Sequence, residues 1–288
     1  MLKAGRAEPV TESFAERFAA VRARFGPLVW GLDPSAELLE SWGFSDSPDG
    51  LDRFADLMIE AVPGVVGLVK PQSAFYERHG WRGIRTLQRL IEGMRSAGVL
   101  AVLDVKRGDV GTTNAAYAET FLGPGAPLEA DAVTVHPYLG LGAMDAFVSL
   151  AHSSGACLLV VTRSTNPQGR VVQAARGDDG LSVEAALLAE IGRLNAELAP
   201  GQIGPVGAVV GSAHLEPSLD LAAANAIFLA PGVGTQGATS SDVARTFAAC
   251  PDRVMPSASR SLLAAGPAIA ALRDAAHALA AELREALG

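Results

Sequence analysis

The sequence predicts a closed (β/α)8 barrel, an α/β fold, preceded by an N-terminal helix. Eight short apolar runs alternate with alanine- and leucine-rich stretches of helical period, and no linker divides the 288 residues. Eight such units close a parallel sheet into a barrel. A doubly wound open sheet is the alternative, but WGLDPS stands at the first run where that fold has G-x-G-x-x-G. We expect one barrel domain over residues 1–288, with 1–26 as a helical extension.

The N-terminal segment carries charges throughout and lacks the apolar core of a secretory signal peptide. No apolar run reaches membrane-spanning length. Cys157 and Cys250 form neither a disulfide framework nor a metal-binding spacing. We therefore expect a soluble cytoplasmic protein. Four apolar side chains recur at helical spacing and predict an amphipathic helix that covers the bottom of the barrel: Phe14, Phe18, Val21 and Phe25.

The predicted strands follow one another along the chain at Leu28–Leu32, Val65–Val69, Val99–Leu103, Ala132–Val135, Cys157–Val161, Val206–Val210, Ala226–Leu229 and Arg253–Met255. The clearest helical stretches between them read LDRFADLMIEAV, IRTLQRLIEGMRSAG and VEAALLAEIGRLNAEL. Active sites of such barrels lie at the carboxyl ends of the strands. Polar residues at the strand ends are therefore the functional candidates.

The overall charge narrows the class of partner. The formal net charge is -8, and both nucleic acid and an anionic membrane would require a basic surface. We therefore expect neither as a partner. An anionic substrate would need a local basic pocket.

The most informative stretch follows the third predicted strand and reads LDVKRGDVGTTN. Alternate strand residues share a face, so Asp104 and Lys106 point to one side. A second carboxylate, Asp109, follows the turn at Gly108. A lysine between carboxylates stays protonated, which makes Lys106 a proton donor rather than a nucleophile. Alternatively, Asp104 and Lys106 form a structural ion pair and Asp109 caps the next helix.

Other strand ends add charged and polar groups to the same mouth. Asp33 and Lys70 end the first two strands. In isolation, Asp33 would indicate a turn and Lys70 a surface lysine. Because both stand at strand ends, we interpret them as part of a functional site. His136, after the fourth strand, has no assignable partner, and we interpret it either as structural or as a neighbour that supports the site residues. The polar segment at 163–181 is typical of a loop that closes over a ligand.

Two features near the end of the chain predict a phosphate site. The stretch FLAPGVGTQGATSSD follows the seventh strand and offers backbone N–H groups at its glycines, while Arg260 follows the eighth strand near a helix start. Barrels commonly bind phosphate at these two loops.

The run LDVKRGDVGTTN resembles the signature of the orotidine 5'-monophosphate decarboxylase family, in which D-x-K-x-x-D precedes an aliphatic residue, a small residue and a threonine. The sequence KRGDVGTT, together with the later loop that contains NPQG, is similar to the longer bacterial branch of this family. The resemblance implies conversion of orotidylate to UMP and CO2, without a cofactor or metal. It implies four catalytic residues, Lys70, Asp104, Lys106 and Asp109.

The resemblance also implies how the substrate is bound. Asp33 and Lys70 match the pair that binds the ribose hydroxyls, and Asp109 with Thr113 matches residues that reach the partner's site in a homodimer. Ser259 stands where relatives often have glycine. The remaining matches concern the base and the phosphate: Ser164 reads the edge of the pyrimidine, Arg163 lines the pocket, Pro231 contacts the base, and Gln236 and Arg260 bind the phosphate.

Two other functions stay open. One is a magnesium-dependent sugar-phosphate decarboxylase or aldolase of the same barrel superfamily, although such a site needs an acidic ligand where this chain has Lys70. The other is a non-catalytic sensor of a phosphorylated ligand, since fold does not fix function.

Overall fold

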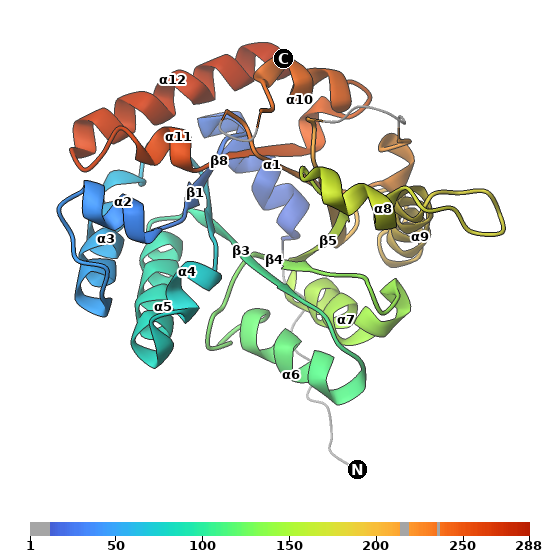
Figure 1. Ribbon diagram of the computed structural model, residues 1–288. Helices are drawn as coiled ribbons and strands as arrows, with labels where there is room; N and C mark the ends of the chain where they lie inside the picture. The colour runs from blue at the N-terminus through green and yellow to red at the C-terminus, as the bar shows by residue number, and fades with distance from the viewer. Residues whose placement is uncertain (1–11, 214–218, 235–236) are drawn as a thin grey trace.

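The computed structural model describes residues 12–213, 219–234 and 237–288. Its parallel strands close into a barrel in chain order, with β8 paired to β1, and helices surround the barrel (Figure 1). This confirms the predicted (β/α)8 barrel and excludes the open sheet. The strands are β1 Val29–Leu32, β2 Leu68–Pro71, β3 Leu100–Arg107, β4 Ala132–Val135, β5 Cys157–Arg163, β6 Val206–Val210, β7 Phe228–Pro231 and β8 Val254–Ala258.

The helical stretches predicted from the sequence are helices in the structure. Within the described ranges, no helix is long and apolar enough to cross a membrane. The α-helices are α1 Phe14–Phe25, α2 Ala36–Ser41, α3 Pro48–Ala61, α4 Ala74–Glu77, α5 Gly80–Ser96, α6 Gly111–Phe121, α7 Asp145–Ser154, α8 Arg170–Gln173, α9 Val183–Leu198, α10 Ser240–Thr246, α11 Arg260–Leu263 and α12 Ile269–Leu287. Short 3-10 turns lie at η1 Leu141–Met144, η2 Pro167–Gly169, η3 Ala222–Ala224 and η4 Pro251–Arg253.

Alternation along each strand separates two hydrophobic layers. In β3, Leu100 and Val102 belong to a cluster that draws on all eight strands and fills the barrel interior. Ala101, Leu103 and Val105 belong to the larger cluster between the strands and the surrounding helices. Asp104 has the parity of Leu100 and Val102, so its side chain points into the barrel above this interior layer.

The predicted N-terminal helix is α1, and it closes one end of the barrel. Ser13 and Glu16 form a capping box at its start. Phe14 and Phe18 are buried in the interior cluster, so α1 seals the barrel end opposite the strand carboxyl ends. Arg17 fixes the helix further, through Asp131 and a 3.0 Å hydrogen bond to the carbonyl of Gly155.

The strands extend further toward the polar residues than the sequence predicts. β3 continues to Arg107, beyond the predicted apolar run that ends at Leu103, and β5 continues to Arg163, beyond the run that ends at Val161. Pairing with a neighbouring strand uses backbone groups, so it does not end where the apolar side chains end. Asp104 and Lys106 therefore stand on β3, as the expected alternation of their side chains requires.

Candidate active site

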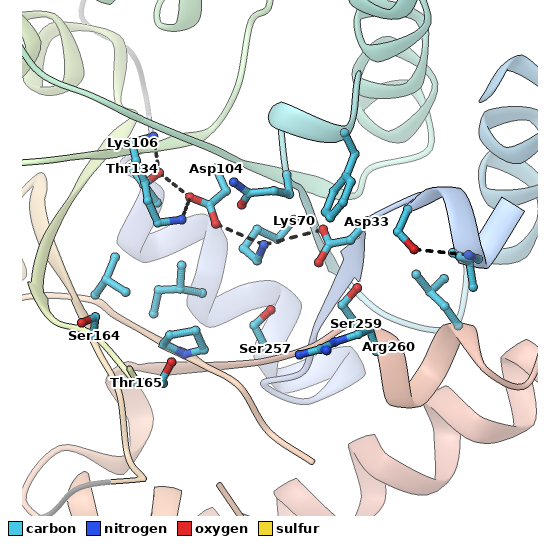
Figure 2. Close-up of a pocket in the computed structure, with 18 of the residues that line it drawn as sticks. Asp33, Lys70, Asp104, Lys106, Thr134, Ser164, Thr165, Ser257, Ser259 and Arg260 are labelled. Carbon is cyan, nitrogen blue, oxygen red and sulfur yellow. Dashed lines mark hydrogen bonds and ion pairs between the residues drawn. The ribbon is translucent and has the colours of Figure 1, made fainter. Parts of the chain in front are cut away.

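A pocket of about 900 Å³ lies at the carboxyl ends of the strands. It brings together residues that lie far apart in the sequence, from Asp33 just after β1 to Ala264 at the end of α11, as the barrel predicts (Figure 2). Eight of the site residues predicted from the sequence line it: Asp33, Lys70, Asp104, Lys106, Ser164, Pro231, Ser259 and Arg260.

Asp104 is the centre of a connected charge network. Its Oδ2 lies 3.2 Å from Lys70 Nζ, and its Oδ1 lies 2.5 Å from Lys106 Nζ. Thr134 donates a hydrogen bond of 2.7 Å to the same Oδ1. Lys70 Nζ also lies 3.9 Å from Asp33 Oδ1, so the contacts run as a chain from Lys106 to Asp33 (Figure 2).

The network keeps its charges in spite of burial. Burial alone would raise the pKa of Asp104, but Lys70, Lys106 and the Thr134 hydroxyl outweigh it and lower the pKa to about 2. Burial opposes the charge on Lys70, yet Asp33 and Asp104 raise its pKa above the ordinary value. The pocket therefore holds a carboxylate and a buried ammonium group side by side at neutral pH.

Asp33 presents an acceptor atom that the described protein groups leave unsatisfied. Its Oδ1 is buried and has no hydrogen-bond partner, because Lys70 lies too far away for a hydrogen bond. The backbone before Asp33 is held by Tyr76, whose hydroxyl donates to the carbonyl of Leu32 at 3.1 Å. A buried carboxylate oxygen that points into a pocket is suited to accept a ligand hydroxyl.

One wall of the pocket is apolar. Val161, Val209 and Leu229 belong to the interior cluster and also line the pocket. They face a site that holds two ammonium groups and two carboxylates. A wall of this kind excludes water and strengthens electrostatic interactions inside the pocket.

A third cationic group, Arg260, stands at the far side of the pocket from Lys106 (Figure 2). Arg260 begins α11 and forms no ion pair with a carboxylate in the described ranges. Ser259 precedes it, and Gly31 makes room for this serine: a side-chain carbon at position 31 would lie 2.5 Å from Ser259 Cβ. Figure 2 shows Arg260 beside Ser259 and Ser257. The unpaired guanidinium is suited to bind an anionic group of a ligand.

At the end of β5, two adjacent predicted residues lie differently. Ser164 lines the pocket, and its Oγ lies 2.7 Å from Asn166 Oδ1 and 2.8 Å from Gln173 Nε2. Arg163 is buried away from the lining, with its Nε and Nη2 each 2.8 Å from a Glu184 oxygen. The expectation that Arg163 lines the pocket is therefore corrected: a guanidinium buried to 2% exposure stays near its buried carboxylate.

Asp109 and Thr113 lie outside the pocket of their own chain. Asp109 follows Gly108, which packs against the carbonyl of His136 so closely that a side-chain carbon would lie 2.5 Å from it. Asn114 holds this turn by accepting a hydrogen bond of 2.9 Å from the Asp109 backbone. Thr113 is exposed on α6. Gln236, predicted to bind phosphate, lies outside the described residues.

Sequence reasoning missed several polar residues of the lining, chiefly Gln72, Thr134, Thr165 and Ser257. Each lies at or near the carboxyl end of a strand. For Thr134 a signal was available, because it is a polar residue with interior parity in the otherwise apolar run AVTV. His136 remains without a described side-chain partner; burial and the nearby Lys106 lower its pKa.

A closed parallel barrel and a lysine–aspartate network in a pocket at its strand ends define the chain as a (β/α)8-barrel enzyme. Residues 26–275 match the model of the orotidine 5'-phosphate decarboxylase / HUMPS family. The chain therefore belongs to the orotidine 5'-phosphate decarboxylase family, as the D-x-K-x-x-D motif predicts.

Individual relatives are similar in sequence to this chain over nearly its whole length. The orotidine 5'-phosphate decarboxylase of Salinispora arenicola is 47% identical over 96% of this chain and 99% of its own length. That of Streptomyces coelicolor is 46% identical with the same coverage. A crystal structure from Streptomyces avermitilis, provisionally given the same enzyme name, superposes with a TM-score of 0.92 at 44% identity and covers 96% of this chain and 97% of its own.

Proposed function

We propose that the pocket decarboxylates orotidine 5'-phosphate to UMP and CO2, a step of pyrimidine biosynthesis, with Lys106 as the proton donor and without a cofactor. The carboxy-lyase activity follows from the family. The observation that carries the proposed mechanism is the position of Lys106 Nζ, 2.5 Å from Asp104 in a pocket with an apolar wall. A lysine side chain held against a carboxylate in such a pocket is placed to donate a proton to the substrate.

The chemistry requires a group that stabilises negative charge. When the bond between C6 and the carboxylate breaks, the electron pair stays on C6, and no neighbouring carbonyl is placed to delocalise it. An ammonium group close to C6 stabilises the developing carbanion electrostatically and then transfers a proton to it. Lys106 is suited to both steps.

Asp104 favours the same reaction from the other side. With a pKa of about 2 it stays ionised, and it would lie near the carboxylate of the substrate. Two like charges raise the energy of the bound substrate, and the repulsion ends as neutral CO2 departs. Lys70 keeps Asp104 ionised, because its Nζ lies 3.2 Å from the second oxygen.

The other lining residues would bind the parts of the substrate that do not react. The unsatisfied oxygen of Asp33, with Lys70 nearby, suits the ribose hydroxyls. Ser164 and Pro231 suit the pyrimidine, and Arg260 suits the phosphate, with Ser259 and Gln236 as further contacts. Binding energy from these remote contacts offsets the repulsion at the carboxylate.

The test is Lys106→Ala. Turnover of orotidine 5'-phosphate, followed by its ultraviolet absorbance, should be abolished, while UMP still binds because the phosphate and ribose contacts remain. Arg107→Ala is the matched control, since it removes the adjacent cation, which pairs with Glu77 at 2.6 Å instead. It should keep its activity. Substantial turnover by Lys106→Ala would contradict the assigned role.

A magnesium-dependent reaction of the same barrel superfamily is the second candidate. The carboxylates Asp33 and Asp104 favour it in isolation, since Mg²⁺ prefers oxygen ligands. Lys70 opposes it, because its ammonium group lies between the two carboxylates and already neutralises them. A non-catalytic sensor is disfavoured because binding alone would not require Lys106 to be paired with Asp104 in the pocket.

We also propose that two chains form a homodimer in which Asp109 and Thr113 complete the partner's site. The support is threefold: neither residue lines its own pocket, the turn that carries Asp109 is fixed by Asn114, and large apolar side chains are exposed on and beside this turn. The exposed side chains are Val110, Tyr138 and Leu139, at 54%, 85% and 52%. Apolar residues exposed together are typical of an interface.

Mixed dimers test this arrangement. Asp109→Ala and Lys106→Ala should each be inactive alone, but a mixed dimer has one restored site, which combines Lys106 of the first chain with Asp109 of the second. Random mixing of equal amounts makes about half of the dimers mixed, so about a quarter of wild-type activity should return.

The double variant supplies the control. Mixing Asp109→Ala/Lys106→Ala with wild-type chain should leave about a quarter of the sites active if Asp109 acts on the partner, because both sites of each mixed dimer are then defective. If Asp109 acts within its own chain, about half of the sites stay active and the first mixture recovers nothing. Either of those results would contradict the shared site.

We place this reaction in the cytoplasm. Cys157 and Cys250 are free and buried, and burial raises the pKa of their thiols to about 12 and about 11. Such thiols are unreactive and suit a reducing compartment.

A further inference from the structure

The strand that carries Lys106 is irregular at that residue. β3 pairs with β4 at Leu103 opposite Val133 and next at Arg107 opposite Val135, so four steps along β3 match two along β4. Within this bulge Lys106 has a φ of +44°. A lysine in the left-handed region is strained, and such strain persists only where surrounding groups hold it.

The side chain opposite this bulge is Thr134, the middle residue of the two steps on β4. Its Oγ1 accepts a hydrogen bond of 3.0 Å from the backbone N–H of Lys106. The same hydroxyl donates its only proton to Asp104 Oδ1, at 2.7 Å. Thr134 is fully buried and lines the pocket. One hydroxyl therefore contacts both the backbone of the lysine and the carboxylate to which its ammonium group binds.

We propose that Thr134 is a positioning residue, whose hydroxyl aims the Lys106 ammonium group at the reacting carbon by fixing the bulge and the orientation of Asp104. The inference rests on the proton-donor role proposed for Lys106. Bulges commonly re-aim a side chain beside an active site. Here the re-aimed backbone needs an acceptor for its N–H group, and Thr134 supplies it from the neighbouring strand.

Packing alone does not require a hydroxyl at this position. Valine has nearly the shape of threonine, and valines occupy comparable lining positions at Val161 and Val209. A Thr134→Val chain should therefore fold, but Lys106 would lose the acceptor that holds its backbone and Asp104 would lose one of its donors. The contacts proposed for the ribose and phosphate come from Asp33 and Arg260, which stand on other elements, so they should persist.

The test compares Thr134→Val with Thr134→Ser, which keeps the hydroxyl. We expect kcat of the valine variant to fall by about tenfold to a hundredfold, as for a misplaced reacting group. The KM for orotidine 5'-phosphate and the affinity for UMP should stay within about twofold, because the remote contacts that set binding are retained. The serine variant should recover most of kcat.

Thr162→Val is the matched control. Thr162 is a buried threonine near the end of β5, and its hydroxyl donates only to the carbonyl of Val160, at 3.1 Å. Its kcat should stay near that of the wild type. An unchanged kcat in Thr134→Val would overturn the inference, as would a serine variant as impaired as the valine variant. A parallel loss of UMP affinity would also overturn it, since it would indicate a general structural role.

Lys106→Ala, assayed in the same series, separates this inference from the proposed function. If Lys106→Ala is inactive and Thr134→Val is fully active, only the role of Thr134 is overturned. If Lys106→Ala retains substantial turnover, the proton-donor proposal fails and the inference fails with it.

Discussion

Arg260→Ala should weaken the binding of phosphorylated ligands selectively. Arg260 lines the pocket and forms no ion pair with a carboxylate of the described residues, so its charge is available to the ligand. A hydrogen bond to a charged group contributes about 1.5–3 kcal/mol. Its loss corresponds to roughly tenfold to 150-fold weaker binding of UMP. Uridine lacks the phosphate, so its affinity should change by less than about twofold by the same reasoning.

Isothermal titration calorimetry of UMP and of uridine with the wild type and with Arg260→Ala gives four affinities. These four values form a thermodynamic cycle. The cycle isolates the interaction between Arg260 and the phosphate from any general effect of the substitution. Arg193→Ala is the control, because Arg193 is 58% exposed and pairs with Glu197 on α9. Its affinities for UMP and for uridine should equal those of the wild type. Equal weakening of UMP and uridine by Arg260→Ala would refute the phosphate assignment.

Two further predictions concern the charge network. Activity should survive exhaustive chelation, because Lys70 occupies the space between Asp33 and Asp104 that a metal would need; loss on chelation with recovery in magnesium would favour the second candidate function. The second prediction concerns the stability of the fold at low pH. The pKa of Asp104 falls from 3.8 to about 2 on folding, so its charge stabilises the fold by about 2 kcal/mol above pH 4, and this contribution is lost as the pH falls toward 2. Urea unfolding measures this contribution. Between pH 6 and pH 3 the free energy of unfolding of the wild type should fall by about 1 kcal/mol more than that of Asp104→Asn. An equal fall in both proteins would contradict the low pKa.

The fold could be predicted because each of its determinants is local in the sequence. The apolar runs, the helical periods and the order in which they alternate specify strands, helices and a barrel without reference to long-range contacts. The barrel then brings Asp33, Lys70 and Asp104 to one mouth, although they lie at or near the ends of three different strands. Strand-end polarity predicted the site for the same reason.

Arg163, which the sequence did not place correctly, is held by a contact between distant segments. Arg163 has the right position for the pocket, but Glu184, 21 residues later on α9, draws its guanidinium away. Nothing in the spacing of either residue reveals this pair. Asp109, by contrast, is expected to reach the partner's site, and it lies outside the pocket of its own chain in a turn fixed by Asn114.

The D-x-K spacing itself illustrates how far sequence reasoning extends. Strand alternation predicts that Asp104 and Lys106 share a side, and the 2.5 Å contact between them agrees with that. The backbone between them, however, is not a regular strand: it bulges, and Lys106 lies in the left-handed region. The motif therefore determines the side on which the lysine lies, while its direction depends on the acceptor that Thr134 provides from β4. A search for residues that control this chemistry should accordingly extend to polar side chains on the strand beside the motif.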